Sequence, residues 1–487
     1  MNDKSISVLT RRRFIRQAAC AALGTAALTD AITNLRFINA ASAQSAISDY
    51  KALVCIFLSG GNDSNNLIIP TIQSEYDNYA SIRTNVLAIP ISGAPYVAIP
   101  LSPLNSDGHN YGLHPACPEL ATLFGEGKLA PMFNTGTLLY PLTRAQYKAG
   151  NPVQPPQLFS HSDQVTQWQT SLPDRPPLTG WGGRCADLLN SVQPGAPISL
   201  AVTLAGANTF EVGSIVSQYS VTTSGAINLS GVSGARLQAL SNILGVPSQN
   251  LQVQAYAGVG AHALQTGGLL NSAIAPTAAA NYWNVPFPTT VTSPTGGTAF
   301  NSYLASQLRM IARLIEAGNR SAANGGFGMR RQIFFCQVGG YDLHSGQTPG
   351  PGQTAVGSHA NLLAELSQGM FAFQRAMEQL GLSNKVTTFT ASDFGRTFPC
   401  NGDGTDHGWG SHHLVLGGAV KGQRTYGTFP TLAVNGPDDT NTGRWIPTTA
   451  VDQYFATLAT WFGVDNSNLA TVFPNIGRFA TSNLGFV

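Results

Sequence analysis

The chain has 487 residues, of which 43% are hydrophobic and only 10% are charged, and its formal net charge is +2. This length and hydrophobic content allow one large or two ordinary domains with a sizeable core, and they exclude a disordered chain. The 52 glycines and 29 prolines favour a loop-rich enzyme or binding protein over a helical bundle.

The N-terminus has the pattern of an export signal. Residues 10–16 (TRRRFIR) carry paired arginines, residues 17–32 are weakly apolar, and residues 41–43 (ASA) form a small-residue cleavage pattern. We predict a twin-arginine signal peptide over residues 1–43 and a mature domain over residues 44–487. The twin-arginine (Tat) translocase is then a partner during export, and the location is periplasmic or secreted. We expect no membrane span in the mature form, because no other stretch approaches about 18 consecutive apolar residues.

Cleavage after Ala43 removes six basic and two acidic residues, a difference of four charges, so the formal charge falls from +2 to −2. A nearly neutral protein has no electrostatic footprint for nucleic acid or an anionic membrane. Five cysteines remain without a C-x-x-C spacing, so export permits disulfides but the sequence assigns none. They are Cys55, Cys117, Cys185, Cys336 and Cys400.

The first predicted strand covers residues 51–58 (KALVCIFL), which are apolar after the first position. It runs into two glycines and then Asp63, and open α/β sheets place their ligands at such strand ends. An Asx-type turn around Asp63 is the structural alternative. A helix over residues 111–128 and a strand over residues 129–133 are predicted next.

Ser160 precedes a predicted helix over residues 165–171, and two interpretations stay open for it. Asp163 follows three residues later, which resembles a helix-capping arrangement. A hydroxyl at a helix N-terminus is also a suitable nucleophile for an anionic ester, because the helix dipole favours negative charge there.

Residues 205–297 change to an uncharged polar composition, and residues 237–308 contain no Asp, Glu, Lys or Arg. We interpret residues 205–297 as an insertion or cap on the main sheet. It either lines a substrate cleft with Tyr256, Tyr282 and Trp283 or is a passive addition.

Regular structure is predicted to return with a helix over residues 300–317 and a buried strand over residues 332–338. Asp342 and His344 follow this strand, and a spacing of two in an extended segment puts both on one side, where one metal could bind both. A solvated surface pair is the alternative. A long helix over residues 355–380 comes next.

Ligand chemistry is most concentrated in residues 392–413 (SDFGRTFPCNGDGTDHGWGSHH), which follow a predicted strand over residues 386–391. Asp393 lies at the end of that strand, and the glycines after it disfavour a helix until a strand over residues 412–416. Imidazoles and carboxylates in such a loop suit a divalent metal. A late helix is predicted over residues 450–462.

Three strand ends therefore carry Asp63, Asp342 and Asp393, with His344 and His407 close behind the last two. The carboxyl ends of strands in a doubly wound sheet share one edge, so these side chains are expected to converge on one or two divalent metals. The chain has no G-x-S-x-G elbow, no H-E-x-x-H and no P-loop.

From the arginine pair to the C-terminus the chain resembles the exported bacterial family catalogued as domain of unknown function 1501. The motifs that carry the resemblance are LSGGNDSNNLIIP at 58–70, SHSDQ at 160–164, GGYDLHS at 339–345, SDFGRT at 392–397 and TDHGWGSHHLVLGGAVKG at 405–422. That family looks like a branch of the alkaline phosphatase and sulfatase superfamily. Its members hold two metals at strand ends and attack phosphate or sulfate esters with a Ser, a Thr or a modified Cys.

The resemblance implies that Asp342, His344 and His407 hold one metal, whereas Asp63 and Asp393 share the other. Its catalytic candidates are Ser160, with Ser162 as a competitor, His161 and Arg396.

The chain departs from the superfamily at two places. Phe394 stands where the superfamily has the histidine of an Asp-His pair, and only Leu343 separates an Asp and a His that are usually three residues apart. The second metal therefore requires an imidazole from His161, His412 or His413, or Arg396 contacts an anionic group in its place.

The expected fold is α/β, an alkaline-phosphatase-like three-layer sandwich with a mostly parallel central sheet and a loop-rich insertion. The expected function is metal-dependent hydrolysis of phosphate or sulfate esters on a small molecule or polysaccharide, with one or two ions of zinc, calcium, magnesium or manganese. The alternative is a non-catalytic exported binding or assembly protein, with carbohydrate as one candidate ligand, and Phe394 favours it.

Overall fold

The computed structural model describes residues 47–193, 195–227, 229, 231–247 and 251–487. The predicted signal peptide lies outside these residues. None of the described helices combines the length and the apolar character that a membrane crossing requires.

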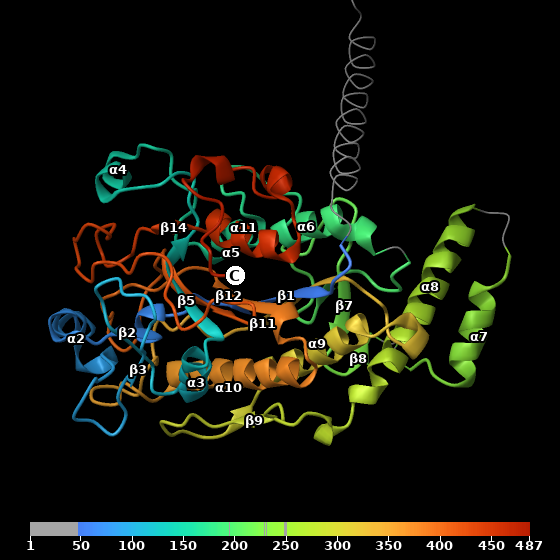
Figure 1. The fold of residues 1–487 in the computed structure, drawn as a ribbon, viewed down its shortest axis with the longest axis horizontal. Helices are drawn as coiled ribbons and strands as arrows, with labels where there is room; N and C mark the ends of the chain where they lie inside the picture. The colour runs from blue at the N-terminus through green and yellow to red at the C-terminus, as the bar shows by residue number, and fades with distance from the viewer. Residues whose placement is uncertain (1–46, 194, 228, 230, 248–250) are drawn as a thin grey trace, which may run out of the picture. The chain divides into compact units, whose positions relative to one another are not determined.

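A mostly parallel sheet of nine strands forms the centre of the described part of the chain (Figure 1). In spatial order the strands are β14 (Thr449–Ala450), β5 (Leu129–Gly136), β13 (Ser411–Leu416), β12 (Val386–Ser392), β1 (Lys51–Leu58), β11 (Arg331–Val338), β6 (Ala201–Thr203), β7 (Tyr219–Thr222) and β8 (Gly225–Ala226). Strand β1 pairs in parallel with β11 and β12 over almost its whole length, and seven of its eight residues are buried. Both sheet faces are therefore covered, as continuous apolar strands require.

Helices cover the two faces of this sheet, which makes a three-layer α/β sandwich (Figure 1). One face carries α3 (Pro118–Gly125), α9 (Tyr303–Asn319) and α10 (Ser358–Gln379), and the other carries α5 (His161–Thr170), α6 (Trp181–Leu189) and α11 (Val451–Phe462). The predicted α/β class and mostly parallel sheet are thus confirmed.

The remaining elements are peripheral to this sandwich. A small sheet contains β2 (Ile68–Pro70), β4 (Tyr111–Leu113) and β3 (Ile99–Pro100), and a two-stranded one contains β9 (Thr290–Val291) and β10 (Phe300–Asn301). The other α-helices are α2 (Gln73–Leu87), α4 (Arg144–Ala149), α7 (Ala235–Leu244), α8 (Leu251–Ile274) and α12 (Leu469–Val472). Within residues 205–297, β7 and β8 extend the edge of the main sheet, and α7 and α8 follow them.

The five strands predicted for this sheet, β1, β5, β11, β12 and β13, and the helices α9, α10 and α11 begin and end within three residues of their predicted limits. The strands β6, β7, β8 and β14 were not predicted. The predicted helix over residues 111–128 is wrong in its first half. Tyr111–Leu113 is strand β4, which pairs with β2 and β3, and the helix begins only at Pro118. Proline fixes the first helical turn and lacks an N–H, so it is favoured at a helix start and not seven residues inside one.

Four of the five cysteines are buried free thiols, and Cys400 is a half-buried free thiol. Cys55 and Cys336 lie in the neighbouring strands β1 and β11, where they behave as small core residues.

Candidate metal centre

The chain brings four potential metal ligands to the carboxyl ends of the central strands. Asp342 and His344 follow β11, and His161 is the first residue of α5. Strand β13 is antiparallel to β12, so the loop between them begins and ends at the same edge of the sheet. His407 lies in this loop, which explains how a residue well beyond β12 stays at the strand ends.

These ligands surround the carboxylate of Asp342. His407 Nε2 lies 3.3 Å and His344 Nε2 lies 3.2 Å from Asp342 Oδ1, and His161 Nε2 lies 3.4 Å from Asp342 Oδ2. A tetrahedral ion with bonds of about 2.0–2.1 Å separates its ligands by about 3.3 Å. His161, Asp342 and His407 each offer one ligand atom within 4.8 Å of the others, and His344, which approaches Asp342 and His407, is not part of this group of three. The spacing therefore suits a zinc-sized ion.

A second set of oxygen atoms orients the three imidazoles. His161 Nδ1 donates to Asp393 Oδ2 at 2.7 Å, His344 Nδ1 to Asp406 Oδ1 at 3.0 Å, and His407 Nδ1 to the carbonyl oxygen of Phe159 at 2.7 Å. Histidines that bind metals commonly donate their other N–H to a carboxylate or carbonyl, which fixes the tautomer and the ring orientation. Here that pattern leaves the Nε2 lone pair of each ring facing Asp342.

The close approach of His344 and His407 requires a positive charge between their rings, from a metal ion or from an added proton. The Nε2 atoms of His344 and His407 lie only 2.9 Å apart, and both rings donate through Nδ1. Two lone pairs and a carboxylate at such distances repel one another unless a metal ion or added protons separate them. Burial lowers the pKa of His407, and the nearby His161 adds to this shift, whereas the hydrogen bond to the Phe159 carbonyl opposes it. A lower pKa favours the neutral imidazole, the form that binds a metal.

Hydrogen bonds from the guanidinium of Arg396 fix the position of the Asp342 carboxylate. Its guanidinium is fully buried and donates from Nη1 to Asp342 Oδ1 at 2.7 Å and to the carbonyl oxygen of Gly60 at 3.2 Å, and from Nη2 to the carbonyl oxygen of Thr405. Burial alone would raise the pKa of Asp342, but Arg396 outweighs it and lowers that pKa. Arg396 thus bonds a candidate metal ligand, Asp342. From the sequence, it was expected instead to contact an anionic group of the substrate.

Asp63 does not join this cluster. Its side chain is buried and pairs with Arg83 of α2, and Gln347 donates to the same carboxylate at 2.6 Å. Burial raises the pKa of Asp63, but the Arg83 charge outweighs it and the net shift is downward. Asp393 is near the cluster, but it accepts from His161 and from the backbone N–H of Gly60 at 3.0 Å. Asp63 and Asp393 were expected to share a second metal. In the structure, Asp63 instead forms an ion pair and Asp393 instead orients His161.

Phe394 packs against two of the imidazoles of the cluster. It is completely buried, and its ring centroid lies 4.8 Å from that of His161 and 4.6 Å from that of His407. His412 and His413 are buried in β13, where burial lowers the pKa of each to about 3. Of the three histidines considered for the missing imidazole, only His161 reaches the cluster. Among the described residues, one group of three or more metal-binding side chains is present.

Gly61 allows Phe394 to pack in this way. It has φ of +84°, and a Cβ added there would lie 2.5 Å from the Phe394 ring. We expect Gly61→Ala to destabilise the fold by about 1–3 kcal/mol more than Gly93→Ala, measured by denaturant unfolding, because the added methyl group must displace the ring. Gly93 is a matched control, since its φ is +70° and nothing lies within 4 Å of its added Cβ. Equal losses would show that only the backbone conformation matters.

Ser160 lies beside the cluster at the start of α5. It occupies the N-cap position, but its side chain makes no capping bond and instead donates from Oγ to Asp163 Oδ2 at 2.6 Å. Ser162 Oγ lies 3.4 Å from Ser160 Oγ and is exposed. The capping geometry considered for Ser160 is therefore absent, and its hydroxyl instead has a carboxylate as proton acceptor.

No role was expected for Asp406 or for the carbonyl of Phe159, which orient two of the rings. Asp406 had a visible signal, because it directly precedes His407 in the segment richest in ligand side chains. The carbonyl had none, since every residue carries one.

Fold and site together define a three-layer α/β protein with a histidine-rich candidate metal centre at the carboxyl ends of its central strands. Residues 316–473 match the family model described as "Protein of unknown function (DUF1501)", which supports the resemblance to that family. No curated protein matches the chain.

Among solved structures, the C-terminal periplasmic domain of EcEptC from Escherichia coli, in complex with Zn, is similar to this chain. The identity is 9% and the TM-score is 0.31, over 86% of this chain and 84% of that one. A likeness this distant supports neither a function nor a ligand here.

Proposed function

We propose that this chain is an exported, metal-dependent hydrolase of phosphate or sulfate esters on an alkaline-phosphatase-like fold. The observation that carries the proposal is the set of three imidazoles whose Nε2 atoms face Asp342 while their Nδ1 atoms donate to oxygens. Three nitrogens and a carboxylate favour zinc over calcium or magnesium, which prefer oxygen ligands. One ion fits this ligand set.

The ion would be held by His161, Asp342, His344 and His407. When bound, it supplies a Lewis acid that polarises an ester oxygen and stabilises developing negative charge. The protein's own contribution begins with Ser160, whose hydroxyl donates to Asp163 and can transfer its proton there as it attacks. The N-terminus of α5 favours an anionic group beside Ser160.

Loss of the Ser160 hydroxyl tests the chemistry. With zinc-loaded protein and an aryl phosphate or aryl sulfate as substrate, we expect Ser160→Ala to lower kcat by at least about 100-fold, because removal of a nucleophile or its proton transfer has effects of this order. Ser162→Ala is the matched control, since it removes a hydroxyl two residues away, and its kcat should stay within a few-fold. Equal activity of the parent and Ser160→Ala would remove the serine from the mechanism.

The second candidate function is a non-catalytic exported binding or assembly protein, with carbohydrate as one candidate ligand. Phe394 favours it, because a buried phenyl ring follows Asp393 where the resemblance implies the metal-binding histidine of an Asp-His pair. Under this function the protein retains its metal, but neither aryl ester is hydrolysed above the rate of protein from which zinc has been removed.

The proposal also includes export through the twin-arginine pathway, with a periplasmic or secreted mature protein, and Arg11 and Arg12 support it. Replacing both by lysine should leave the uncleaved precursor in the cytoplasm, measured by fractionation, because the pathway reads the arginine pair. Normal export of that variant would rule out this route.

A further inference from the structure

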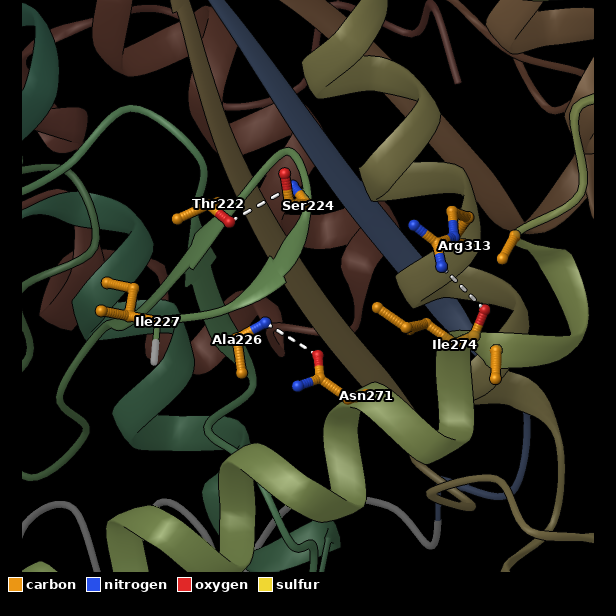
Figure 2. A pocket seen from close by; sticks show the side chains of 9 residues that line it. Thr222, Ser224, Ala226, Ile227, Asn271, Ile274 and Arg313 are labelled. Atoms are coloured by element: carbon orange, nitrogen blue, oxygen red, sulfur yellow. Dashed lines mark hydrogen bonds between the residues drawn. The ribbon is translucent and has the colours of Figure 1, made fainter. Parts of the chain in front are cut away.

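A pocket lies at the β8 edge of the sheet, apart from the metal centre. It has a volume of about 520 Å³ and opens between the β7–β8 hairpin, the end of α8 and the helix α9 (Figure 2). Its lining is mostly apolar or neutral, with one charged side chain. The lining residues are Thr222, Ser224, Ala226, Ile227, Asn271, Ile274, Ala275, Ala278 and Arg313. None of them belongs to the metal centre, so the pocket is a separate candidate site.

Arg313 is the charged residue, and its guanidinium lacks a counter-charge. The side chain is only 7% exposed. It donates from Nη2 to the carbonyl oxygen of Ile274 at 3.0 Å and from Nε to Thr277 Oγ1 at 3.4 Å, and Nη1 makes no hydrogen bond to a described residue. No carboxylate within the described ranges forms an ion pair with it. A buried charge without an opposite charge is costly, so Arg313 favours an anion in the space beside it.

The surrounding charges strengthen this preference. Arg309 lies one helical turn before Arg313 on α9, so a second positive charge adds to the potential of the pocket. Burial and Arg309 both lower the pKa of Arg313. The residues from 237 to 308, which include the α8 wall, contain no carboxylate that could neutralise it.

The remaining polar groups suit the same ligand. Asn271 Oδ1 accepts from the backbone N–H of Ala226 at 3.0 Å, which leaves its Nδ2 as a donor. In Figure 2, Thr222 and Ser224 lie on the hairpin wall, across the pocket from Arg313. Ile227 and Ile274 supply apolar surface between them. A hollow with one cation, few polar groups and apolar walls matches an amphipathic organic anion.

We propose that this pocket binds a small organic monocarboxylate, whose carboxylate pairs with Arg313 and whose apolar body lies against Ala226, Ile227 and Ile274. A monoanion fits because a single guanidinium lines the pocket, and the planar fork of arginine matches a carboxylate in a bidentate way. The volume lies within the range of small-molecule sites, which is about 300–1,000 Å³.

A purely structural role for Arg313 is the competing explanation, since Arg313 also caps the C-terminal end of α8. Arg320 separates the two explanations. It donates to the carbonyl oxygen of Ala273, the preceding residue of α8, but it pairs with Glu316 and does not line the pocket. A variant at Arg320 therefore removes a similar capping bond and leaves the pocket unchanged.

Calorimetric titration of the full chain with octanoate and with benzoate tests the proposal, with octanamide and benzamide as uncharged analogues. We expect at least one acid to bind, its amide to bind at least about tenfold more weakly, and Arg313→Gln to weaken the acid by a similar factor. Arg320→Gln should leave the affinity for the acid unchanged. Equal affinities for acid and amide, or equal losses in the two arginine variants, would overturn the proposal, as would no binding of either acid up to about 10 mM.

Ala278→Trp is a second test of the pocket, which remains informative if Arg313→Gln fails to fold. Ala278 is exposed and lines the pocket, so a large side chain there fills the opening while every residue of the core is retained. The parent and this variant should have the same unfolding midpoint without ligand, and the variant should lose binding of the acid. Binding retained by the blocked variant would place the ligand elsewhere and overturn the assignment.

Discussion

His407→Ala should lose most of its bound metal, with an affinity for zinc lowered by more than about 100-fold, because it removes one of the three side chains whose ligand atoms the fold already holds together. The loss should lower stability as well, since a ligand that binds only the folded state stabilises it by about 4 kcal/mol at 1,000 times its Kd. Metal content by elemental analysis and calorimetric melting with and without a chelator measure both effects.

His109→Ala is the matched control for this experiment. His109 is also partly buried and also bonds a carboxylate, since its Nδ1 lies 2.6 Å from Glu75 Oε1, but it is not part of the cluster. Its variant should bind zinc as the parent does and should respond to the chelator equally. If the chelator does not change the melting temperature of the parent, protons on the imidazoles hold the cluster together in place of a metal ion. The hydrolase proposal would then lose its main support.

The orienting oxygens should give intermediate effects. Asp406→Ala leaves His344 with its ring but without the acceptor for its Nδ1–H, so the Nε2 lone pair is no longer fixed toward Asp342. Such outer partners typically account for about 10–100-fold in metal affinity. A graded series from Asp406→Ala to His407→Ala would separate orientation from direct binding.

The sequence was sufficient to predict the central strands and the convergence at their ends. Strands β1, β11 and β12 are continuous apolar segments, and such segments in a parallel sheet are buried whichever strands flank them. Because parallel strands share an edge, Asp342 and the histidines that follow could be expected to meet there. The pairing partners of β13, in contrast, depend on contacts far along the chain, and no local pattern specifies them.

The different roles of the three carboxylates could not be predicted either, because they also depend on contacts between distant parts of the chain. Asp63, Asp342 and Asp393 each follow an apolar strand, so their local sequences are equivalent. What distinguishes them is the nearest cation: Arg83 for Asp63, Arg396 for Asp342, and no guanidinium bond for Asp393, which His161 contacts instead. These partners lie between 20 and 232 positions away in the sequence. A strand end predicts where a carboxylate lies, but the fold decides which carboxylate remains available to a metal.

Asp63→Ala should therefore destabilise the protein strongly and leave its metal bound. Asp63 and Arg83 are a buried ion pair, with side-chain exposures of 3% and 0%, and removal of one partner leaves the other charge buried and uncompensated. Breaking such pairs costs about 3–5 kcal/mol. Asp342→Ala should lose most of its metal, and it should also destabilise the metal-free protein, because it leaves the buried guanidinium of Arg396 without its carboxylate partner. Metal content therefore distinguishes the two variants.

The pH dependence of unfolding gives an independent measurement of the same pair. The pKa of Asp63 is lower in the folded than in the unfolded state, so the unfolded chain takes up its proton first on acidification. The pair's contribution is therefore complete above the unfolded pKa, near 3.8, and is lost as the pH falls toward the folded value. Denaturant unfolding of chelated protein between about pH 5 and pH 2 should show a steeper loss of stability for the parent than for Asp63→Ala. The opposite outcome is that Asp63→Ala has the same pH dependence of unfolding as the parent and releases its metal at neutral pH. Asp63 would then be a metal ligand, as the resemblance to the superfamily implies.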